Sequence, residues 1–406
     1  MKYKITSILK ATYMFCVALF FILDCNGNPP LKIVDPNATK ETKALLANLL
    51  KIQKVGVMFG HHDGLMYGRQ WSNQQDRSDV HEIVGDYPAV YSVDFAVIMD
   101  GRTSTGNGVN EAALRRTIRE AYARGEVITA CIHINDPLTG GSSWARENKS
   151  DAVKEILKTG SPTHIKYLTW LDRLANFANT MTATPSGGEL IPILFRPYHE
   201  HTQTWSWWSS THTTEEEFIG LWRFTIEYLR DIKGVRNFLY AISPQMDRNY
   251  GTPGTRERLL FRWPGDEWVD FLGMDCYHGT RTEAYDMNLS VMLDISREKG
   301  IPCGVTETGL EGIGLGSNCN GNPNTNYWTQ QQLTPLKNLW NNKEGETVSM
   351  VIMWRNKYVV ENRLDTDCHF FGPWIGHPSA DNFKLFFQDP ITLFSKDLFD
   401  MYKPNR

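Results

Sequence analysis

Two glutamates of this chain stand where they could carry out acid–base and nucleophilic chemistry together. Glu200 lies in IPILFRPYHEHTQTWSWW (residues 191–208), shortly after an apolar run. Glu307 lies in PCGVTETG (residues 302–309), again at the end of a short apolar run. Glycoside hydrolysis requires one carboxylic acid for the leaving oxygen and one carboxylate on the other side of the sugar. The two glutamates therefore predict a glycosidase, and a retaining one if the carboxyl groups lie about 5–5.5 Å apart.

The residues around Glu200 suit a carbohydrate ligand. Arg196 directly follows the apolar run and can fix the charge and orientation of Glu200, while Trp205, Trp207 and Trp208 come after the glutamate. Flat indole faces pack well against the C–H groups of a sugar ring. The alternative is a core strand followed by a loop, with Arg196 and Glu200 forming a structural ion pair. Three indoles within a polar segment favour a binding site over that alternative.

The rest of the chain alternates strand-like and helix-like segments, as expected for βαβ units around a parallel sheet. Eight strand-like runs in about 370 residues predict a single (β/α)8 TIM barrel, and no G-x-G-x-x-G follows the first run to favour a dinucleotide fold. The runs are 55–60, 89–95, 127–134, 191–195, 238–242, 271–274, 302–305 and 349–354. The clearest helical segments are 39–51, 111–124, 163–179, 214–232, 286–299 and 329–340.

Polar residues follow all eight strand-like runs at the same end, which is where TIM barrels carry their active sites. Glu200 follows the fourth run and Glu307 ends the seventh, so we expect the two side chains to face one another across the barrel. The other polar residues at these ends are His61, His62, Asp63, Asp94, His133, Asn135, His199, Gln245, Asp275, Tyr277, His278 and Arg355.

The segments that hold these residues resemble glycoside hydrolase family 26, a family of mostly β-mannanases within the clan A barrels. RPYHEHTQTWSWW and VTETG carry the likeness, together with GHHDGLMYGRQW and HPSADNFKLFFQDP. The resemblance implies cleavage of β-1,4-mannosidic bonds in mannan, galactomannan or glucomannan by double displacement, without a cofactor. In this scheme Glu200 is the general acid/base and Glu307 is the nucleophile. After Glu200 the chain carries His201, Thr202 and Gln203, where the family more often shows a hydrophobic residue and Asn-Gly, so contacts on the leaving-group side stay open.

The resemblance also implies roles for residues around the two glutamates. His199 contacts the nucleophile or the sugar at the cleavage point, and Tyr277 hydrogen-bonds the nucleophile. Trp205 stacks on the leaving-group side, and Arg196 supports the site from its base. Sugars on the non-reducing side are expected to bind His133, Trp354, Arg355 and Trp374.

Three alternatives remain open at this point. Members of the family also act on β-1,3-xylan or mixed-linkage β-glucan, and loops such as 136–146 and 317–326 decide whether the groove is open or releases mannobiose. A metal-dependent barrel hydrolase would use ligands such as His61, His62, Asp63, His133 and Asp275. Adjacent strand residues point to opposite faces, which argues against both histidines binding one ion. A non-catalytic glycan-binding lipoprotein would explain the tryptophans but not the two glutamates.

Composition and the N-terminal segment bear on location and partners. The net charge of −4 over 406 residues predicts no nucleic-acid partner. Residues 1–25 resemble a bacterial lipoprotein signal peptide that ends at a lipidated Cys25, followed by a linker (26–38) and the catalytic domain (39–406). We therefore expect a monomer that is lipid-anchored in the cell envelope of a bacterium, periplasmic or surface-facing. Cys131, Cys276 and Cys303 read as buried thiols, whereas Cys319 and Cys368 could form a disulfide.

Overall fold

The computed structural model describes residues 31–105, 107–145, 149–246, 254–314, 325–360 and 367–404. Residues Lys32–Arg406 form one compact unit. The expected lipidation site, Cys25, lies outside the described residues. Within the described ranges, none of the helices combines the length and the apolar character that crossing a bilayer demands.

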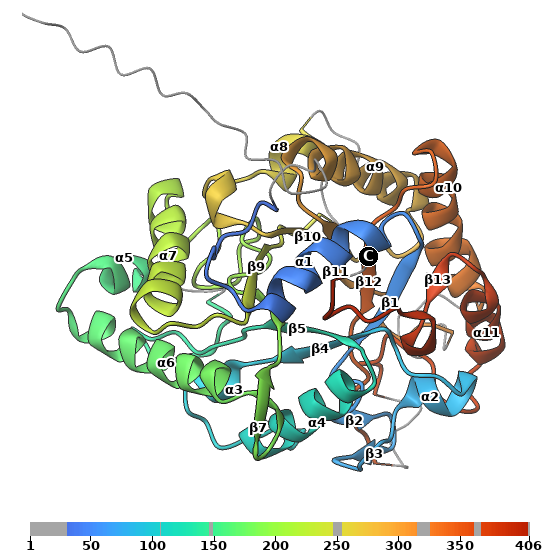
Figure 1. Cartoon of the computed structure of the whole chain (residues 1–406), viewed down its shortest axis with the longest axis horizontal. Helices are drawn as coiled ribbons and strands as arrows, with labels where there is room; N and C mark the ends of the chain where they lie inside the picture. The colour runs from blue at the N-terminus through green and yellow to red at the C-terminus, as the bar shows by residue number, and fades with distance from the viewer. Residues whose placement is uncertain are drawn as a thin grey trace, which may run out of the picture. The chain divides into compact units, whose positions relative to one another are not determined.

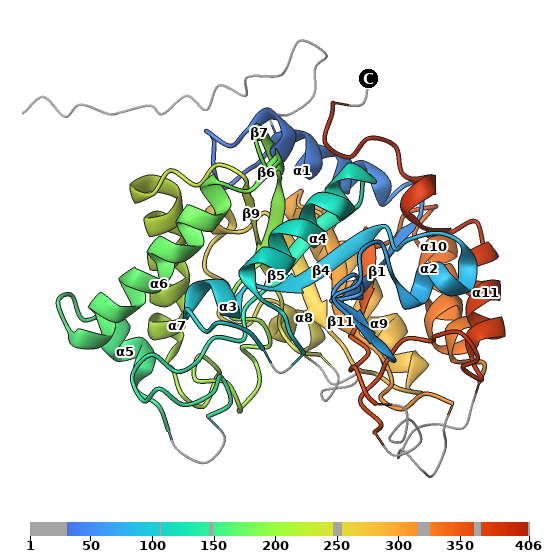
Figure 2. The ribbon, with the colours of Figure 1, turned by 90° about the horizontal axis from the view of Figure 1, so that it is seen from below.

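Eight parallel strands close into a barrel, which confirms the TIM barrel predicted from the sequence (Figures 1 and 2). The last strand pairs with the first, Met350 opposite Met58, and this pairing closes the ring. A short extra strand, β13 (Thr392–Leu393), also pairs with β1. The barrel strands are β1 (Val57–His62), β4 (Val90–Asp94), β5 (Val127–Cys131), β8 (Ile193–Arg196), β9 (Phe238–Ile242), β10 (Phe271–Asp275), β11 (Cys303–Thr308) and β12 (Met350–Met353).

The long helices form where the sequence predicts them, and their caps explain where they begin and end. Thr39 caps α1 at its start, Thr214 forms a capping box with Glu217 at the start of α7, and Gly300 ends α9 with a φ of 66°. The long helices are α1 (Lys40–Ile52), α4 (Glu111–Ala123), α6 (Pro162–Asn179), α7 (Glu215–Glu227), α9 (Thr282–Lys299) and α10 (Thr334–Asn342).

Two helices predicted as continuous contain a π-helical turn instead. The first is η1 (Tyr228–Ile232) after α7, and the second is η4 (Trp328–Leu333) before α10. The elements not predicted are mostly too short to show a periodic pattern. They are α2 (Asp79–Val84), α3 (Ala96–Met99), α5 (Ala152–Leu157), α8 (Thr255–Leu259), α11 (Ala380–Gln388), η2 (Asp266–Trp268), η6 (Ser395–Asp397), the hairpin of β2 (Tyr67–Gly68) and β3 (Trp71–Ser72), and the hairpin of β6 (Thr182–Thr184) and β7 (Gly187–Leu190).

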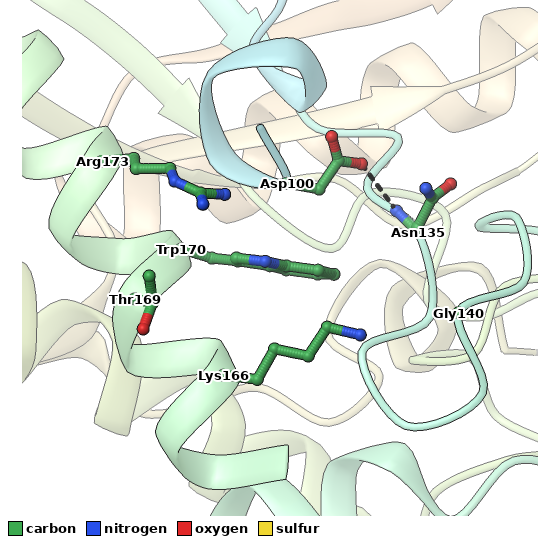
Figure 3. A pocket seen from close by; sticks show the side chains of 7 residues that line it. All are labelled: Asp100, Asn135, Gly140, Lys166, Thr169, Trp170 and Arg173. Carbon is green, nitrogen blue, oxygen red and sulfur yellow. Dashed lines mark hydrogen bonds between the residues drawn. The ribbon is translucent and has the colours of Figure 1, made fainter. Parts of the chain in front are cut away.

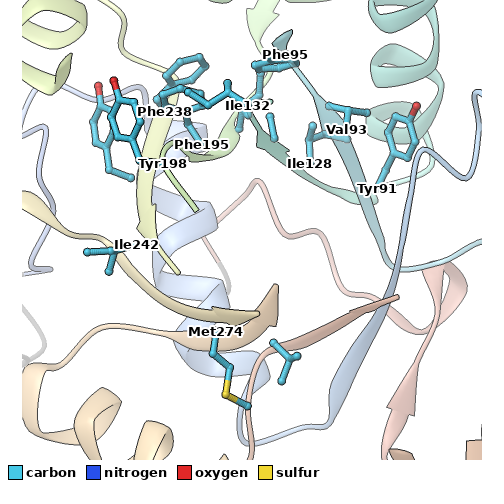
Figure 4. Close-up of a cluster of buried hydrophobic side chains, with 14 of the residues drawn as sticks. Tyr91, Val93, Phe95, Ile128, Ile132, Phe195, Tyr198, Phe238, Ile242 and Met274 are labelled. Atoms are coloured by element: carbon cyan, nitrogen blue, oxygen red, sulfur yellow. The ribbon is translucent and has the colours of Figure 1, made fainter. Parts of the chain in front are cut away.

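Successive side chains of each barrel strand point in opposite directions, so the strands contribute to two hydrophobic cores. One set of strand residues, including Met58, Val90 and Leu194, clusters with Leu45 and Leu49 of α1. These residues fill the barrel, and α1 covers one end of it (Figure 2). The alternate set packs outward against the surrounding helices, as Figure 4 shows for Tyr91, Val93, Phe95, Ile128, Phe195 and Phe238. Since α1 and its apolar neighbours fill one end, the polar strand ends are left to gather at the other.

The cysteines agree with the sequence analysis as far as the structure describes them. Cys131, Cys276 and Cys303 are buried and form no disulfide. Cys368 is disulfide-bonded. Cys319, its possible partner by sequence, lies outside the described residues.

Candidate active site

Glu200 and Glu307 come together at the carboxyl ends of the barrel strands. Glu200 follows β8, whereas Glu307 lies within β11. The two glutamates and Asp275 each offer a carboxylate oxygen, and these three oxygens lie within 4.8 Å of one another. Both glutamate residues are buried, with 9% and 3% of their surfaces exposed. The structure therefore places side by side two carboxyl groups that are 107 positions apart in the sequence.

A strained turn presents Glu200. Tyr198 and Glu200 both have a positive φ, 52° and 55°, which is uncommon for residues other than glycine. The backbone N–H of Glu200 donates to the carbonyl oxygen of Ser243 over 2.8 Å, which ties the turn to the end of β9. The Tyr198 hydroxyl is buried and lies 2.7 Å from the hydroxyl of Thr225 on α7. These contacts hold the backbone in a conformation that it would not keep alone.

Both carboxylate oxygens of Glu307 accept hydrogen bonds. Arg196 donates to Oε1, and the Tyr277 hydroxyl donates to Oε2 over 2.9 Å. Burial raises the pKa of Tyr277 well above its usual value, and the charge of Glu307 raises it further, so Tyr277 remains a donor. Burial lowers the pKa of Arg196, but the neighbouring carboxylates outweigh this and raise it above its usual value. The hydrogen bond expected between Tyr277 and Glu307 is thus present.

Asp275 is a component of the site that the sequence reasoning misses as a partner of Arg196. The guanidinium of Arg196 donates to Asp275 over 2.7 Å and to the Ser243 hydroxyl over 2.9 Å. Thr306 donates to the other oxygen of Asp275 over 2.7 Å. Asp275 is fully buried and ends β10, so its place at a strand end was visible in the sequence. Its pairing with Arg196 was not visible, because the two residues are 79 positions apart.

A chain of polar contacts runs from Glu307 through His199 and His133 to Asp94. Nε2 of His199 lies 4.0 Å from Oε1 of Glu307 and 3.1 Å from Nε2 of His133. Nδ1 of His133 lies 2.8 Å from Oδ2 of Asp94. Burial lowers the pKa of His199 well below its usual value, with a further contribution from neighbouring positive charge. His199 is therefore a neutral ring at neutral pH.

Half-buried residues extend the site beyond His133. The ring of Trp354 stacks on His62 with a centroid distance of 4.2 Å and an interplanar angle of 20°. It also lies 5.8 Å from the His133 ring. Arg355 donates to the Tyr67 hydroxyl over 3.1 Å. His133, Trp354 and Arg355 thus form a group at the ends of β5 and β12. Trp374, predicted for the same region, packs against Phe370 and His377.

The tryptophans after Glu200 separate into two kinds, and this corrects the sequence prediction. Trp205 is half-buried and stacks on Trp144 with a centroid distance of 5.8 Å and an interplanar angle of 14°. Trp144 is 48% exposed. In contrast, Trp207 and Trp208 are fully buried, and Trp208 donates to the carbonyl oxygen of His199 over 2.9 Å. Trp207 and Trp208 therefore belong to the core, and only Trp205 offers a partly open ring.

Members of each group of residues that could bind a metal ion already make polar contacts within the protein. Among the residues that the structure describes, two groups of three bring their potential ligand atoms within 4.8 Å of one another. They are Asp94 with Cys131 and His133, and Glu200 with Asp275 and Glu307. In the first group Asp94 is bonded to His133, and in the second the guanidinium of Arg196 lies between Asp275 and Glu307 and supplies the balancing charge. In the second group the guanidinium of Arg196 thus balances the negative charge of the carboxylates.

A hollow of about 400 Å³ lies between α3, α6 and the loop that follows β5 (Figure 3). Lys166 and Arg173 line it, but each donates to a backbone carbonyl, that of Pro137 and that of Met99 respectively. Neither glutamate of the site is among the lining residues. We therefore assign this hollow no part in the chemistry.

Comparison with known families and curated proteins gives one consistent result. A family described as glycosyl hydrolase family 26 matches residues 34–298. A mannan endo-1,4-beta-mannosidase of Bifidobacterium adolescentis is 37% identical over 256 residues, which cover 62% of this chain and 24% of that protein. The chain thus spans about a quarter of that relative's length. A mannan endo-1,4-beta-mannosidase of Bacillus subtilis (strain 168) is 23% identical over 266 residues, covering 63% and 68% of the two chains.

Solved structures extend the likeness over nearly the whole fold. A family 26 beta-mannanase from Bacteroides ovatus has a TM-score of 0.78 and 37% identity, covering 90% of this chain and 98% of that one. A modular endo-beta-1,4-mannanase from Cellulomonas fimi has a TM-score of 0.78 and 30% identity, covering 92% and 79%. GH26C from Muricauda sp. MAR_2010_75 has a TM-score of 0.79 and 29% identity, covering 92% and 96%.

Proposed function

The chain belongs to glycoside hydrolase family 26, and we propose that it is a retaining endo-β-1,4-mannanase that cleaves mannan, galactomannan or glucomannan. The observation that carries this proposal is the approach of Glu200 and Glu307, whose carboxylate oxygens lie within 4.8 Å at the open end of the barrel. That separation suits direct attack on the sugar better than the insertion of a water molecule. The names of the relatives supply the substrate class, β-mannan.

In the first half of the reaction Glu307 attacks the anomeric carbon of the mannosyl unit. The glycosidic C–O bond breaks, Glu200 gives its proton to the leaving oxygen, and an ester joins the sugar to Glu307. Arg196 and Tyr277 hold the attacking carboxylate from both oxygens, which fixes its position before the reaction begins. As the ester forms, the negative charge that Arg196 faces decreases, while its partner Asp275 keeps it in place.

In the second half Glu200, now ionised, accepts a proton from water, and the oxygen of that water attacks the anomeric carbon. The ester bond breaks and Glu307 regains its charge. Because the carbon is inverted twice, the product keeps the β-configuration of the substrate. One residue thus acts first as acid and then as base, as microscopic reversibility requires.

The surrounding residues define where the polymer lies. Trp205, with its ring stacked on Trp144, offers the aromatic contact on the leaving-group side. His133, Trp354 and Arg355 form the group that receives the non-reducing side, and Trp374 belongs to this side by the family resemblance. His199 lies between the two sides, next to Glu307.

The decisive experiment is hydrolysis of purified linear mannan, glucomannan and galactomannan, with the anomeric configuration of the first products followed by NMR. Mannooligosaccharides of several lengths in the β-configuration support the proposal, and mannobiose alone identifies a mannobiose-releasing enzyme. Cleavage only of β-1,3-xylan or mixed-linkage β-glucan overturns the substrate assignment. Binding of mannan without any new reducing ends identifies a glycan-binding protein instead.

We further propose a monomer in the cell envelope of a bacterium, held to a membrane by a lipid on Cys25. The apolar segment before Cys25 and the polar linker after it support this location. Fractionation of cells that produce the full chain and its Cys25→Ala variant tests the anchor. Loss of the protein from the membrane fraction in the variant supports it, whereas equal distributions of the two forms contradict it.

A further inference from the structure

Asp94 does not contact the two glutamates directly, but it is connected to Glu307 through His133 and His199. It ends β4, and its Oδ1 accepts two backbone hydrogen bonds, from Ala96 over 2.8 Å and from His133 over 3.1 Å. Its Oδ2 faces Nδ1 of His133 at 2.8 Å. Burial alone would raise the pKa of Asp94, but His133 and the backbone donors hold it below its usual value. Asp94 is therefore an ionised acceptor on both of its oxygens.

An acceptor at that position determines where His133 carries its proton. A neutral imidazole has one N–H and one lone pair, and a carboxylate next to Nδ1 requires the N–H there. Nε2 of His133 is then an acceptor. It lies 3.1 Å from Nε2 of His199, so His199 must donate from Nε2.

The surroundings of His199 agree with this arrangement. Its Nε2 lies 4.0 Å from the carboxylate oxygen Oε1 of Glu307, which favours an N–H over a lone pair at that position. Its Nδ1 is buried and has no hydrogen-bond partner within the described part of the chain. A proton on Nδ1 would thus be an unpaired buried donor, while the lone pair of Nε2 would face two acceptors.

We propose that Asp94 is a positioning residue of this active site, which through His133 holds the proton of His199 on the nitrogen that faces Glu307. The inference rests on the proposed function, because it assigns Asp94 to the reaction of Glu307. The positions of the ring protons of His133 and His199 can be measured without any substrate.

Asp94→Asn is the sharpest test, because the geometry leaves the new amide one orientation. The amide oxygen must take the place of Oδ1, where two backbone N–H groups point. The NH2 group then faces Nδ1 of His133 and donates to it. His133 must carry its proton on Nε2, and His199 must move its own to Nδ1, away from Glu307.

Long-range ¹H–¹⁵N correlation spectra at pH 7 distinguish the two ring tautomers of each histidine. In the wild-type protein we expect His133 protonated on Nδ1 and His199 on Nε2, and in D94N both exchanged. We expect kcat on mannan to fall by about 10- to 100-fold, more than KM rises, as a wrong tautomer misplaces a catalytic hydrogen bond. Asp172→Asn is the matched control, since Asp172 is a partly exposed residue of α6 that pairs with Lys233.

Unchanged tautomers in D94N, or exchanged tautomers with an unchanged kcat, overturn the inference. The wild-type spectrum is decisive even if D94N does not fold, because a proton on Nδ1 of His199 overturns it directly. Expected tautomers in a wild-type protein that does not cleave mannan would overturn the proposed function instead.

Discussion

The hydroxyl of Tyr277 donates a hydrogen bond of 2.9 Å to Oε2 of Glu307, from a residue two positions beyond the end of β10. Arg196 takes the other oxygen from the end of β8. The ends of β8 and β10 therefore fix the carboxylate that β11 carries. If Glu307 is the nucleophile, as proposed, the rigid barrel holds it in its attacking position before the reaction begins, so little conformational entropy is lost on the way to the transition state.

Tyr277→Phe removes this hydrogen bond while it keeps the ring. A hydrogen bond to a charged group contributes about 1.5–3 kcal/mol, so we expect kcat on mannan to fall by about 10- to 100-fold with little change in melting temperature. Tyr91→Phe is the matched control, because it deletes the buried hydroxyl that bonds Thr117 on the outer side of the barrel. Equal losses of kcat in the two variants would contradict a specific role of Tyr277.

Glu200→Ala should lower activity on mannan by about 10²- to 10⁴-fold, the usual contribution of general acid–base catalysis. An aryl β-mannoside with a good leaving group needs no acid, so its first step should survive in the variant. Added azide should then raise its turnover and yield β-mannosyl azide, identified by NMR. An α-mannosyl azide, or no rescue at all, would argue against Glu200 as the acid/base.

Trp205 and Trp208 should respond in opposite ways to alanine substitution. Trp208 is fully buried beside Trp207, so W208A should lower the free energy of unfolding by about 3–5 kcal/mol. W205A removes a partly open ring, so it should instead raise KM for mannooligosaccharides by about tenfold with little loss of stability. Chemical denaturation and steady-state kinetics on both variants provide the check, and a large stability loss in W205A would contradict its role as a binding ring.

Glu126 gives a prediction for stability against pH. It is fully buried, burial raises its pKa to about 7, and its Oε1 accepts from Arg124 over 2.5 Å. Because the folded-state pKa lies above the unfolded value of 4.5, the folded state binds the proton more tightly. The stability that this provides is present in full below about pH 4.5 and is lost as the pH rises through about 7.

Glu126→Gln removes that titration and keeps the size of the side chain. The free energy of unfolding of the wild type, relative to E126Q, should decrease by on the order of 3 kcal/mol between pH 4 and pH 8. Urea denaturation of both proteins across this range measures it. A difference that stays constant, or that grows in favour of the wild type, would contradict the buried titration.

The sequence allows both the barrel and the proximity of Glu200 and Glu307 to be predicted, for the same reason. Apolar runs ending in polar residues mark each barrel strand, and the order of the runs places Glu200 and Glu307 at the fourth and seventh strands. The strained backbone at Glu200 could not be foreseen, because its positive φ depends on bonds to β9 and α7. In a barrel, the order of the strands along the chain gives their order around the ring. Local backbone strain instead depends on contacts with residues that are distant in the sequence.

The contacts between site residues show more clearly what the sequence could not predict. The sequence marked Asp275 and Asp94 as strand-end residues, and Asp275 also as a possible metal ligand, but their partners Arg196 and His133 could not be predicted because they lie 79 and 39 positions away. Trp207 and Trp208 were wrongly expected to offer open faces to a sugar, and both are buried. A loop has no periodicity from which the direction of a side chain can be inferred. Composition indicated that aromatic rings were available, but not which of them faced the solvent.

The most direct test of the two-glutamate mechanism is to trap the covalent intermediate. A 2-deoxy-2-fluoro-mannosyl fluoride slows the second half of the reaction more than the first, so the sugar accumulates on the nucleophile. Peptide mass spectrometry should then find a single labelled residue, Glu307, in the wild type and no labelled residue in E307A. A label on any other residue, or turnover of mannan by E307A, would contradict the account.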